Sequence, residues 1–197
     1  MALVKGNARS SSALDATILT GNLPAISGAS LTGVSAGKVG QVLQAYKTSV
    51  QYTNAGSDTD ISGLSIAITP SATSSKILIL SNISGFSHNG VGGGFCISRQ
   101  IGSGSFSKIA QADSASSRVR MSYSGDLYTG DASGENQMSM NAVTAFLDSP
   151  STTSACTYKV VGQLNGNTLH INQTAGDGDS NDNTRTTSQI TVMEVLS

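Results

Sequence analysis

The chain has 197 residues, of which 12% are charged, and its formal net charge is −1. This length suits one medium-sized domain with a tail, or two small domains. Lys and Arg form no basic stripe, which argues against nucleic-acid binding. No apolar stretch approaches the roughly 20 residues that a membrane-crossing helix needs.

Residues 1–40 form a segment rich in Gly, Ser and Ala. Its apolar side chains are too few and too scattered to pack together, so the segment alone should be disordered. We therefore expect an extended N-terminal arm held by a partner, with these apolar residues as anchors: Leu3, Val4, Leu14, Ile18, Leu23, Ile26 and Leu31. The start of the arm lacks the pattern of a signal peptide, so we expect assembly in a cytosol.

From residue 41 onward, the sequence predicts short strands separated by turn residues. The polar component is mainly 33 Ser and 19 Thr, which suit strand faces and turns. No helix is predicted. The expected strands are 41–47, 60–69, 76–83, 94–101, 106–110, 118–123, 137–147, 156–164, 169–173 and 188–196. This pattern predicts an all-β fold in which residues 41–197 form a jelly-roll-like β-sandwich.

Local patterns predict how some strands pair. Residues 77–80 are apolar on both faces, which is typical of a central strand. The turn at 102–105 predicts a hairpin between its flanking strands, and Asn165-Gly166 predicts another between 156–164 and 169–173.

Long apolar segments also bear on the oligomeric state. Residues 77–80 and 142–147 place apolar side chains on both strand faces. A single sandwich buries only one of these faces, so apolar surface is left over. A closed cyclic trimer would cover the surplus and protect the sheet edges. The alternative is a self-sufficient monomeric sandwich.

Two cysteines, Cys96 and Cys156, are too few for a disulfide framework. Both lie in expected strands. We expect buried, reduced thiols, and the alternative is a cross-strand disulfide.

The sequence shows no set of residues that is typical of a catalytic site. Residues 33–37 match the G-x-S-x-G pattern around Ser35, but they lie in the arm, without the strand-to-helix turn that the motif needs. His88 and His170 are expected to be surface residues, and no paired carboxylates stand out. We therefore expect a non-enzymatic protein without a cofactor.

A polar cluster at 177–183 offers a weak candidate for a cation site. Asp177, Asp179 and Asn181 place oxygen ligands at alternate positions, as in a calcium loop. Asp182 stands where that loop has its glycine, and Ser188 stands where it has its bidentate glutamate, so a tight EF-hand-like site is excluded. What remains is a weak site or a solvated loop of turn-forming residues.

Three segments carry a resemblance to a known group of proteins. Residues 22–33 read NLPAISGASLTG, residues 61–83 contain SIAITPSATSSKILI, and residues 188–195 read SQITVMEV. Together they resemble small bacteriophage virion proteins, fibre-like or decoration-like, that are often labelled tail or head fibres. The resemblance implies a virion location and a homotrimer of jelly-roll or tumour-necrosis-factor-like subunits, anchored to other virion proteins through residues 1–40. It leaves open whether the trimer sits on the head, neck or tail.

An alternative function is a receptor- or carbohydrate-binding module that contacts a glycan on the host surface. Tyr123, Asp126, Tyr128 and Asp131 combine aromatic rings with carboxylates, the usual means of holding sugars. The contacting loop would be 123–136 or 175–187, since loops commonly carry binding residues.

Overall fold

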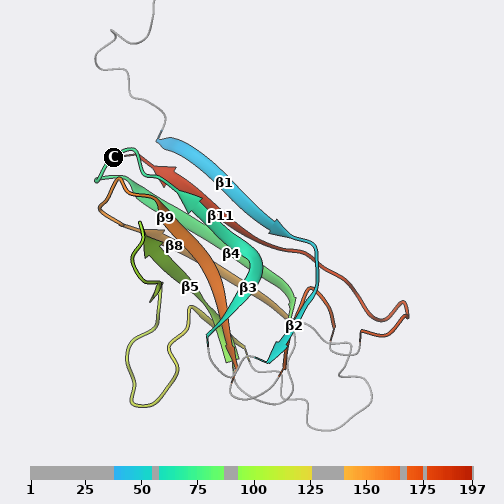
Figure 1. Ribbon diagram of the computed structural model, residues 1–197. Helices are drawn as coiled ribbons and strands as arrows, with labels where there is room; N and C mark the ends of the chain where they lie inside the picture. The colour runs from blue at the N-terminus through green and yellow to red at the C-terminus, as the bar shows by residue number, and fades with distance from the viewer. Residues whose placement is uncertain are drawn as a thin grey trace, which may run out of the picture. The chain divides into compact units, whose positions relative to one another are not determined.

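The computed structural model describes residues 38–54, 58–86, 93–125, 140–164, 168–174 and 177–196 (Figure 1). These residues form strands and no helix, so the expected all-β class is confirmed for the described part of the chain. The strands are β1 (Val39–Lys47), β2 (Gln51–Asn54), β3 (Thr59–Ile68), β4 (Lys76–Phe86), β5 (Gly93–Ile101), β6 (Ser107–Ile109), β7 (Tyr123–Gly125), β8 (Met140–Asp148), β9 (Cys156–Leu164), β10 (Thr168–Ile171) and β11 (Ser188–Val195). Residues 1–37 of the predicted arm (1–40) fall outside the described residues, and residues 39–40, which were assigned to the arm, instead begin β1.

The strands form three open antiparallel sheets. The first sheet has the order β1-β11-β4-β8, and the second has the order β3-β9-β5-β6, with β7 also paired to β5. A two-stranded sheet joins β10 and β2. In Figure 1 the strands β1, β11 and β4 run side by side, as their pairing requires.

The main strand pairs are nested, which means that each pair lies in the sequence between the two strands of the pair before it. The first main strand, β1, pairs with the last, β11, and β3 pairs with β9. Inside these, β4 pairs with β8 and β5 pairs with β6. The chain therefore behaves as one long antiparallel ribbon whose successive pairs alternate between the two main sheets.

One hydrophobic core lies between the first and second sheets, an arrangement compatible with a β-sandwich. In a strand, alternate side chains point to opposite faces, so each sheet sends one set inward. The first sheet contributes Ile77, Ile79, Ile83, Ala142, Ile190 and Val192; the second contributes Ile61, Leu64, Ile68, Phe95, Ile97, Cys156, Tyr158 and Val160; and β10 adds Leu169 and Ile171.

Several sequence predictions of strand position are confirmed. The strand containing 77–80 is β4, which lies centrally between β11 and β8. The expected hairpin around 102–105 joins β5 to β6. Gly102 has a φ of 55°, which its missing Cβ permits in this turn.

Other predictions of strands were wrong. The hairpin expected at Asn165-Gly166 does not form, because both edges of β9 are occupied by β3 and β5, and β10 pairs with β2 instead. Residues 118–122 are not strand; the segment ends in the three-residue β7. The polar strand β2 was not predicted, since its sequence QYTN carries too weak an apolar alternation.

Both cysteines are buried free thiols, as expected. The alternative of a cross-strand disulfide was wrong for a reason of register. Cys96 lies opposite Val161 and Cys156 lies opposite Ile101, so the thiols are five residues apart along β5 and β9. At about 3.4 Å per residue their Cα atoms are roughly 17 Å apart, well beyond the roughly 7 Å limit for a disulfide.

A buried polar triad joins the two main sheets. Arg99 on β5 donates to both carboxylate oxygens of Asp148, at 2.7 and 2.8 Å, and the Tyr158 hydroxyl on β9 donates to Asp148 Oδ2 at 2.7 Å. Burial and the adjacent Asp148 carboxylate raise the pKa of Tyr158 far above its ordinary value. Because Asp148 ends β8, this triad fixes the edge of the first sheet to the second sheet.

A second buried carboxylate, Glu194 on β11, holds the connection between β3 and β4. It is 1% exposed and accepts hydrogen bonds from the Ser71 backbone N–H and hydroxyl, both at 2.6 Å, and from Gln41 Nε2 at 2.8 Å. Burial by itself raises the pKa of Glu194, but these hydrogen bonds outweigh it and lower the pKa to about 2.

The Glu194 contacts predict a specific loss of stability in acid. Because the pKa falls from 4.5 in the unfolded chain to about 2 in the fold, the stabilisation is complete above pH 4.5 and is lost as the pH falls toward 2. Glu194→Gln should lower the free energy of unfolding at pH 7 by about 1–3 kcal/mol, the contribution of hydrogen bonds to a charged group. Urea denaturation at pH 7 and pH 3 measures both effects. The free energy of unfolding should differ less between pH 7 and pH 3 in E194Q than in the wild-type protein. An unchanged difference would contradict the role assigned to Glu194.

Candidate functional site

The outer face of the first sheet is apolar and exposed. Inward side chains of β11, β4 and β8 fill the core. The residues that alternate with them along each strand therefore point outward. We call seven of these outward apolar residues the apolar face: Val42, Leu78, Leu80, Val143, Ala145, Leu147 and Met193. Val195 and Tyr46 also point outward on this sheet. The exposed fractions of its large residues reach 65% for Val143 and 57% for Val42.

The register of the sheet arranges these side chains in rows. Val42 lies opposite Met193, Met193 opposite Leu78, and Leu78 opposite Leu147, so one apolar row crosses all four strands. In the next row, Leu80 lies opposite Ala145. Side chains in directly opposed positions contact one another across strands. The apolar face is therefore continuous from the edge strand β1 to the edge strand β8.

The apolar face carries almost no charge. Among the described outward side chains of these four strands, Lys76 at the start of β4 is the single charged one. The polar outward residues gather toward the other end, where Gln44 Nε2 donates to Thr191 Oγ1 at 2.9 Å and Ser84 donates to Asn141 Oδ1 at 2.8 Å. The surface is thus an apolar region with polar groups toward one end, some of which bond to one another, while the buried Asn82 Oδ1 has no hydrogen-bond partner.

The outer face of the second sheet is different, because a segment of the chain covers it. Cys96 and Val161 point away from the core and are nevertheless buried. Ser122 lies over them: its hydroxyl donates to Cys96 Sγ at 3.4 Å, and its N–H donates to the Phe95 carbonyl at 3.0 Å. Gly94 leaves room for this segment, since a Cβ there would overlap the Tyr123 carbonyl.

Charged side chains also distinguish the second sheet. Lys159 forms an ion pair with Asp60 at 2.7 Å and lies 3.9 Å from the centre of the Phe106 ring. Lys108 pairs with Asp58. This outer face is covered in part and carries ion pairs, whereas the first sheet exposes apolar side chains, so the apolar face is the main candidate for a binding surface.

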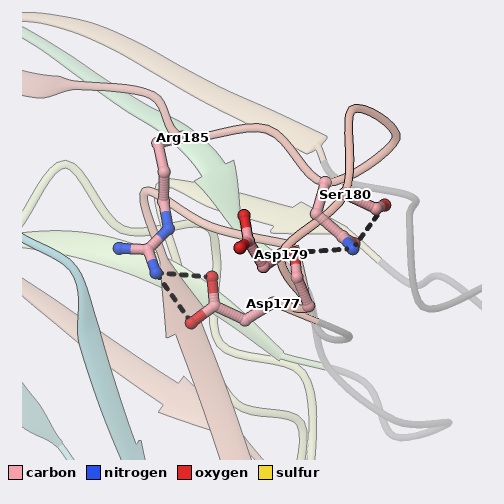
Figure 2. Close-up of a pocket in the computed structure, with 6 residues that line it drawn as sticks. Asp177, Asp179, Ser180 and Arg185 are labelled. Carbon is pink, nitrogen blue, oxygen red and sulfur yellow. Dashed lines mark hydrogen bonds and ion pairs between the residues drawn. The ribbon is translucent and has the colours of Figure 1, made fainter.

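An open depression lies in the 177–185 loop, where the weak cation candidate was predicted (Figure 2). Arg185 faces Asp177 and forms an ion pair with both of its carboxylate oxygens, at 2.7 and 2.9 Å. Asn183 donates to the Gly178 carbonyl at 3.0 Å and accepts from Thr174 at 2.9 Å. Asp177 and Asp179 both line the depression. The Arg185 guanidinium thus already supplies the Asp177 carboxylate with a positive partner.

The described residues place no group of three or more His, Cys, Asp or Glu side chains suitable for a metal ion. Asn181, the third residue of the predicted set, is exposed and is not among the residues that line the depression. The structure thus brings two of the three predicted ligands together.

Beside this loop, Asn172 is a buried residue whose side chain bonds to several segments of the chain, and we call it a hub. The sequence did not reveal this role. It is 0% exposed and has a positive φ of 61°, which Asn tolerates better than most residues. Its Nδ2 donates to the carbonyls of Lys47 and Ser49, both at 3.0 Å, and its Oδ1 accepts from Ser188 at 2.6 Å. Asn172 therefore joins the end of β1 to the start of β11.

His170 was expected at the surface and is instead buried, at 8% exposure. Its Nδ1 lies 3.1 Å from Gln173 Nε2, and its ring packs edge-on against Tyr52 with ring centres 5.0 Å apart. Burial lowers the pKa of His170. The expectation was wrong because β10 pairs with β2 and brings this aromatic neighbour over the imidazole.

The other predicted site residues are mostly outside the described part of the chain. This applies to Asp126, Tyr128 and Asp131 of the receptor-binding set, to Ser35 and His88, and to the seven arm anchors Leu3, Val4, Leu14, Ile18, Leu23, Ile26 and Leu31. Tyr123 is described: it is half-buried and packs against the hydrophobic core.

Comparisons with known proteins identify no relative. No protein-family model matches the chain, and no curated protein is similar to it. Within the described residues, no helix has the length and apolar character needed to span a membrane.

The hydrogen bonds of Asn172 and the ion pair of Asp177 with Arg185 predict different effects of mutation on the free energy of unfolding. Asn172→Ala should lower the free energy of unfolding by about 2–3 kcal/mol, because it leaves buried groups without partners. Asp177→Asn, which removes a solvent-exposed ion pair, should change it by less than about 1 kcal/mol. Chemical denaturation of the two variants measures both. Equal losses would show that the hub is not a special determinant of stability.

Proposed function

We propose that this protein is a structural component of a bacteriophage virion, a short trimeric fibre or a capsid decoration protein docked through residues 1–40. The observation that carries the proposal is the uncharged apolar face on one sheet of a domain whose other sheet is covered and ion-paired. The resemblance of residues 22–33, 61–83 and 188–195 to virion proteins supports the phage assignment.

We also propose that the two main sheets form a jelly roll. The nested pairing supports this fold, because a jelly roll is a long antiparallel ribbon wrapped so that its successive pairs alternate between two sheets. Pairing β1 with β11, β3 with β9, β4 with β8 and β5 with β6 follows that scheme. Such a sandwich presents one flat sheet face on each side, which is suited to building assemblies.

The proposed mechanism is binding at two separate surfaces. An apolar sheet face in water is a protein-interaction surface or an aggregation hazard, and association with other copies removes it from water. The arm docks to a partner through its scattered apolar residues, in the manner of an extended peptide laid into grooves. Three arms on one trimer would raise the avidity of attachment without any new contact.

The full-length protein is expected to be a trimer of about 60 kDa, three times the chain mass of 20.0 kDa, by sedimentation equilibrium. Val143→Asp should shift the mass toward 20.0 kDa, because a charge would be buried between copies. Ala67→Asp, at an exposed position on β3 of the second sheet, is the matched control and should remain trimeric. A monomeric wild-type protein would refute the trimer.

Removing residues 1–35 should abolish incorporation into particles while leaving a folded, soluble trimer. The reason is that the arm supplies attachment and the strands supply the fold and the contacts between copies. Incorporation is measured by the amount of the truncated protein in purified particles, and circular dichroism with sedimentation tests fold and assembly. Normal incorporation of the truncated chain would contradict a docking role for the arm.

A further inference from the structure

We infer that the trimer closes head to tail across the apolar face, with the β1 side of each copy packed on the β8 side of the next. This inference rests on the proposed trimer and adds the contact surfaces and their pairing. The partner of the apolar face is thus a second copy of this chain.

Symmetry requires two different patches on each copy. When identical patches meet each other, the result is a twofold dimer, whereas a ring of three needs contact between unlike patches. The apolar face provides such a pair. Its most exposed side chains lie on the two edge strands: Val42 at 57% on β1, and Val143 at 65% and Leu147 at 46% on β8. Between them, Met193 and Leu78 are half-buried.

The two patches are too far apart to contact each other within one copy. Val42 and Leu147 stand in the same cross-strand row, separated by β11 and β4. Three strand spacings of about 4.8 Å place them roughly 14 Å apart. A contact between these residues can therefore be made only between copies, which makes the pairing testable.

The electrostatics favour another copy as the occupant. The described outward side chains of the face carry one charge, Lys76, which lies at its end, so identical copies can pack without repulsion between like charges. A strongly charged partner would find no complementary group there. In the proposed function, attachment to other virion proteins is left to residues 1–40.

Closing the ring in this way also protects the edges of the sheet. Strands β1 and β8 are the two edges of the first sheet. Apart from Lys47, which is buried, β1 has no charged residue, so its edge exposes no charge that would oppose strand pairing, and only the irregularity between Val39 and Val42 interrupts its register. A neighbouring copy seated on the β1 side would cover this exposed edge in every subunit.

A charge-swap experiment on the full-length chain tests the pairing. Val42→Asp alone and Leu147→Lys alone should each weaken the trimer at least tenfold, because each buries one unpaired charge at every contact. The double variant should recover the trimer in low salt, since each Asp then meets a Lys of the next copy. Raising the salt to about 1 M should weaken the recovered trimer through screening. Ala67→Asp and Ala67→Lys on the second sheet serve as controls, and circular dichroism checks folding.

The outcomes separate the pairing from the proposed function. If both single variants dissociate and the double variant does not recover, the head-to-tail pairing is overturned while the trimer stands. If neither single variant dissociates a trimeric wild-type protein, the apolar face is not the contact surface and the inference is also overturned. If the wild-type protein is not a trimer, the proposed function fails together with the inference.

Discussion

The structure depends on strands that carry apolar side chains on both faces. In the first sheet, Ile77, Ile79 and Val192 fill the core from one side, while Leu78, Leu80 and Met193 occupy the other. A strand alternates strictly, so the core cannot take both sets. The outward set stays at the surface, where the proposed assembly would cover it. In the described strands, the same sheet that completes the core also carries the surface that the proposed assembly would cover.

Polar groups fix where this surface lies. Asp148, held by Arg99 and Tyr158, anchors the end of β8 to the second sheet, and Glu194 anchors β11 to the turn that begins at Ser71. Buried charges with full hydrogen bonding specify a single arrangement more sharply than apolar contacts do. The edge strand β8 is held directly, and the edge strand β1 is held to Glu194 of β11 through Gln41, so both have the defined position that the proposed contact between copies would need.

Much of this fold could be predicted from the sequence, because hydrophobic alternation and turn residues mark most strands directly. The central place of β4 followed from its two-sided apolar pattern. Pairing was harder: Asn165-Gly166 is a strong local hairpin signal, yet β9 already has partners on both edges. Asn172 and His170 could not be assigned from sequence, since their burial depends on contacts with β1 and β2 that are distant along the chain.

The most direct test of the account is hydroxyl-radical footprinting of the full-length protein at a concentration where it is assembled. Leu80 and Phe106 have nearly equal exposure in the isolated chain, at 37% and 38%, but Leu80 lies on the first sheet, whereas Phe106 precedes β6 and contacts Lys159 of the second sheet. The account predicts that Leu80, Leu147 and Met193 are protected from oxidation while Phe106 is oxidised. Oxidation of Leu80 in the assembled protein at the same rate as in the Val143→Asp variant would show that the apolar face is open to water, and would contradict its role as the surface between copies.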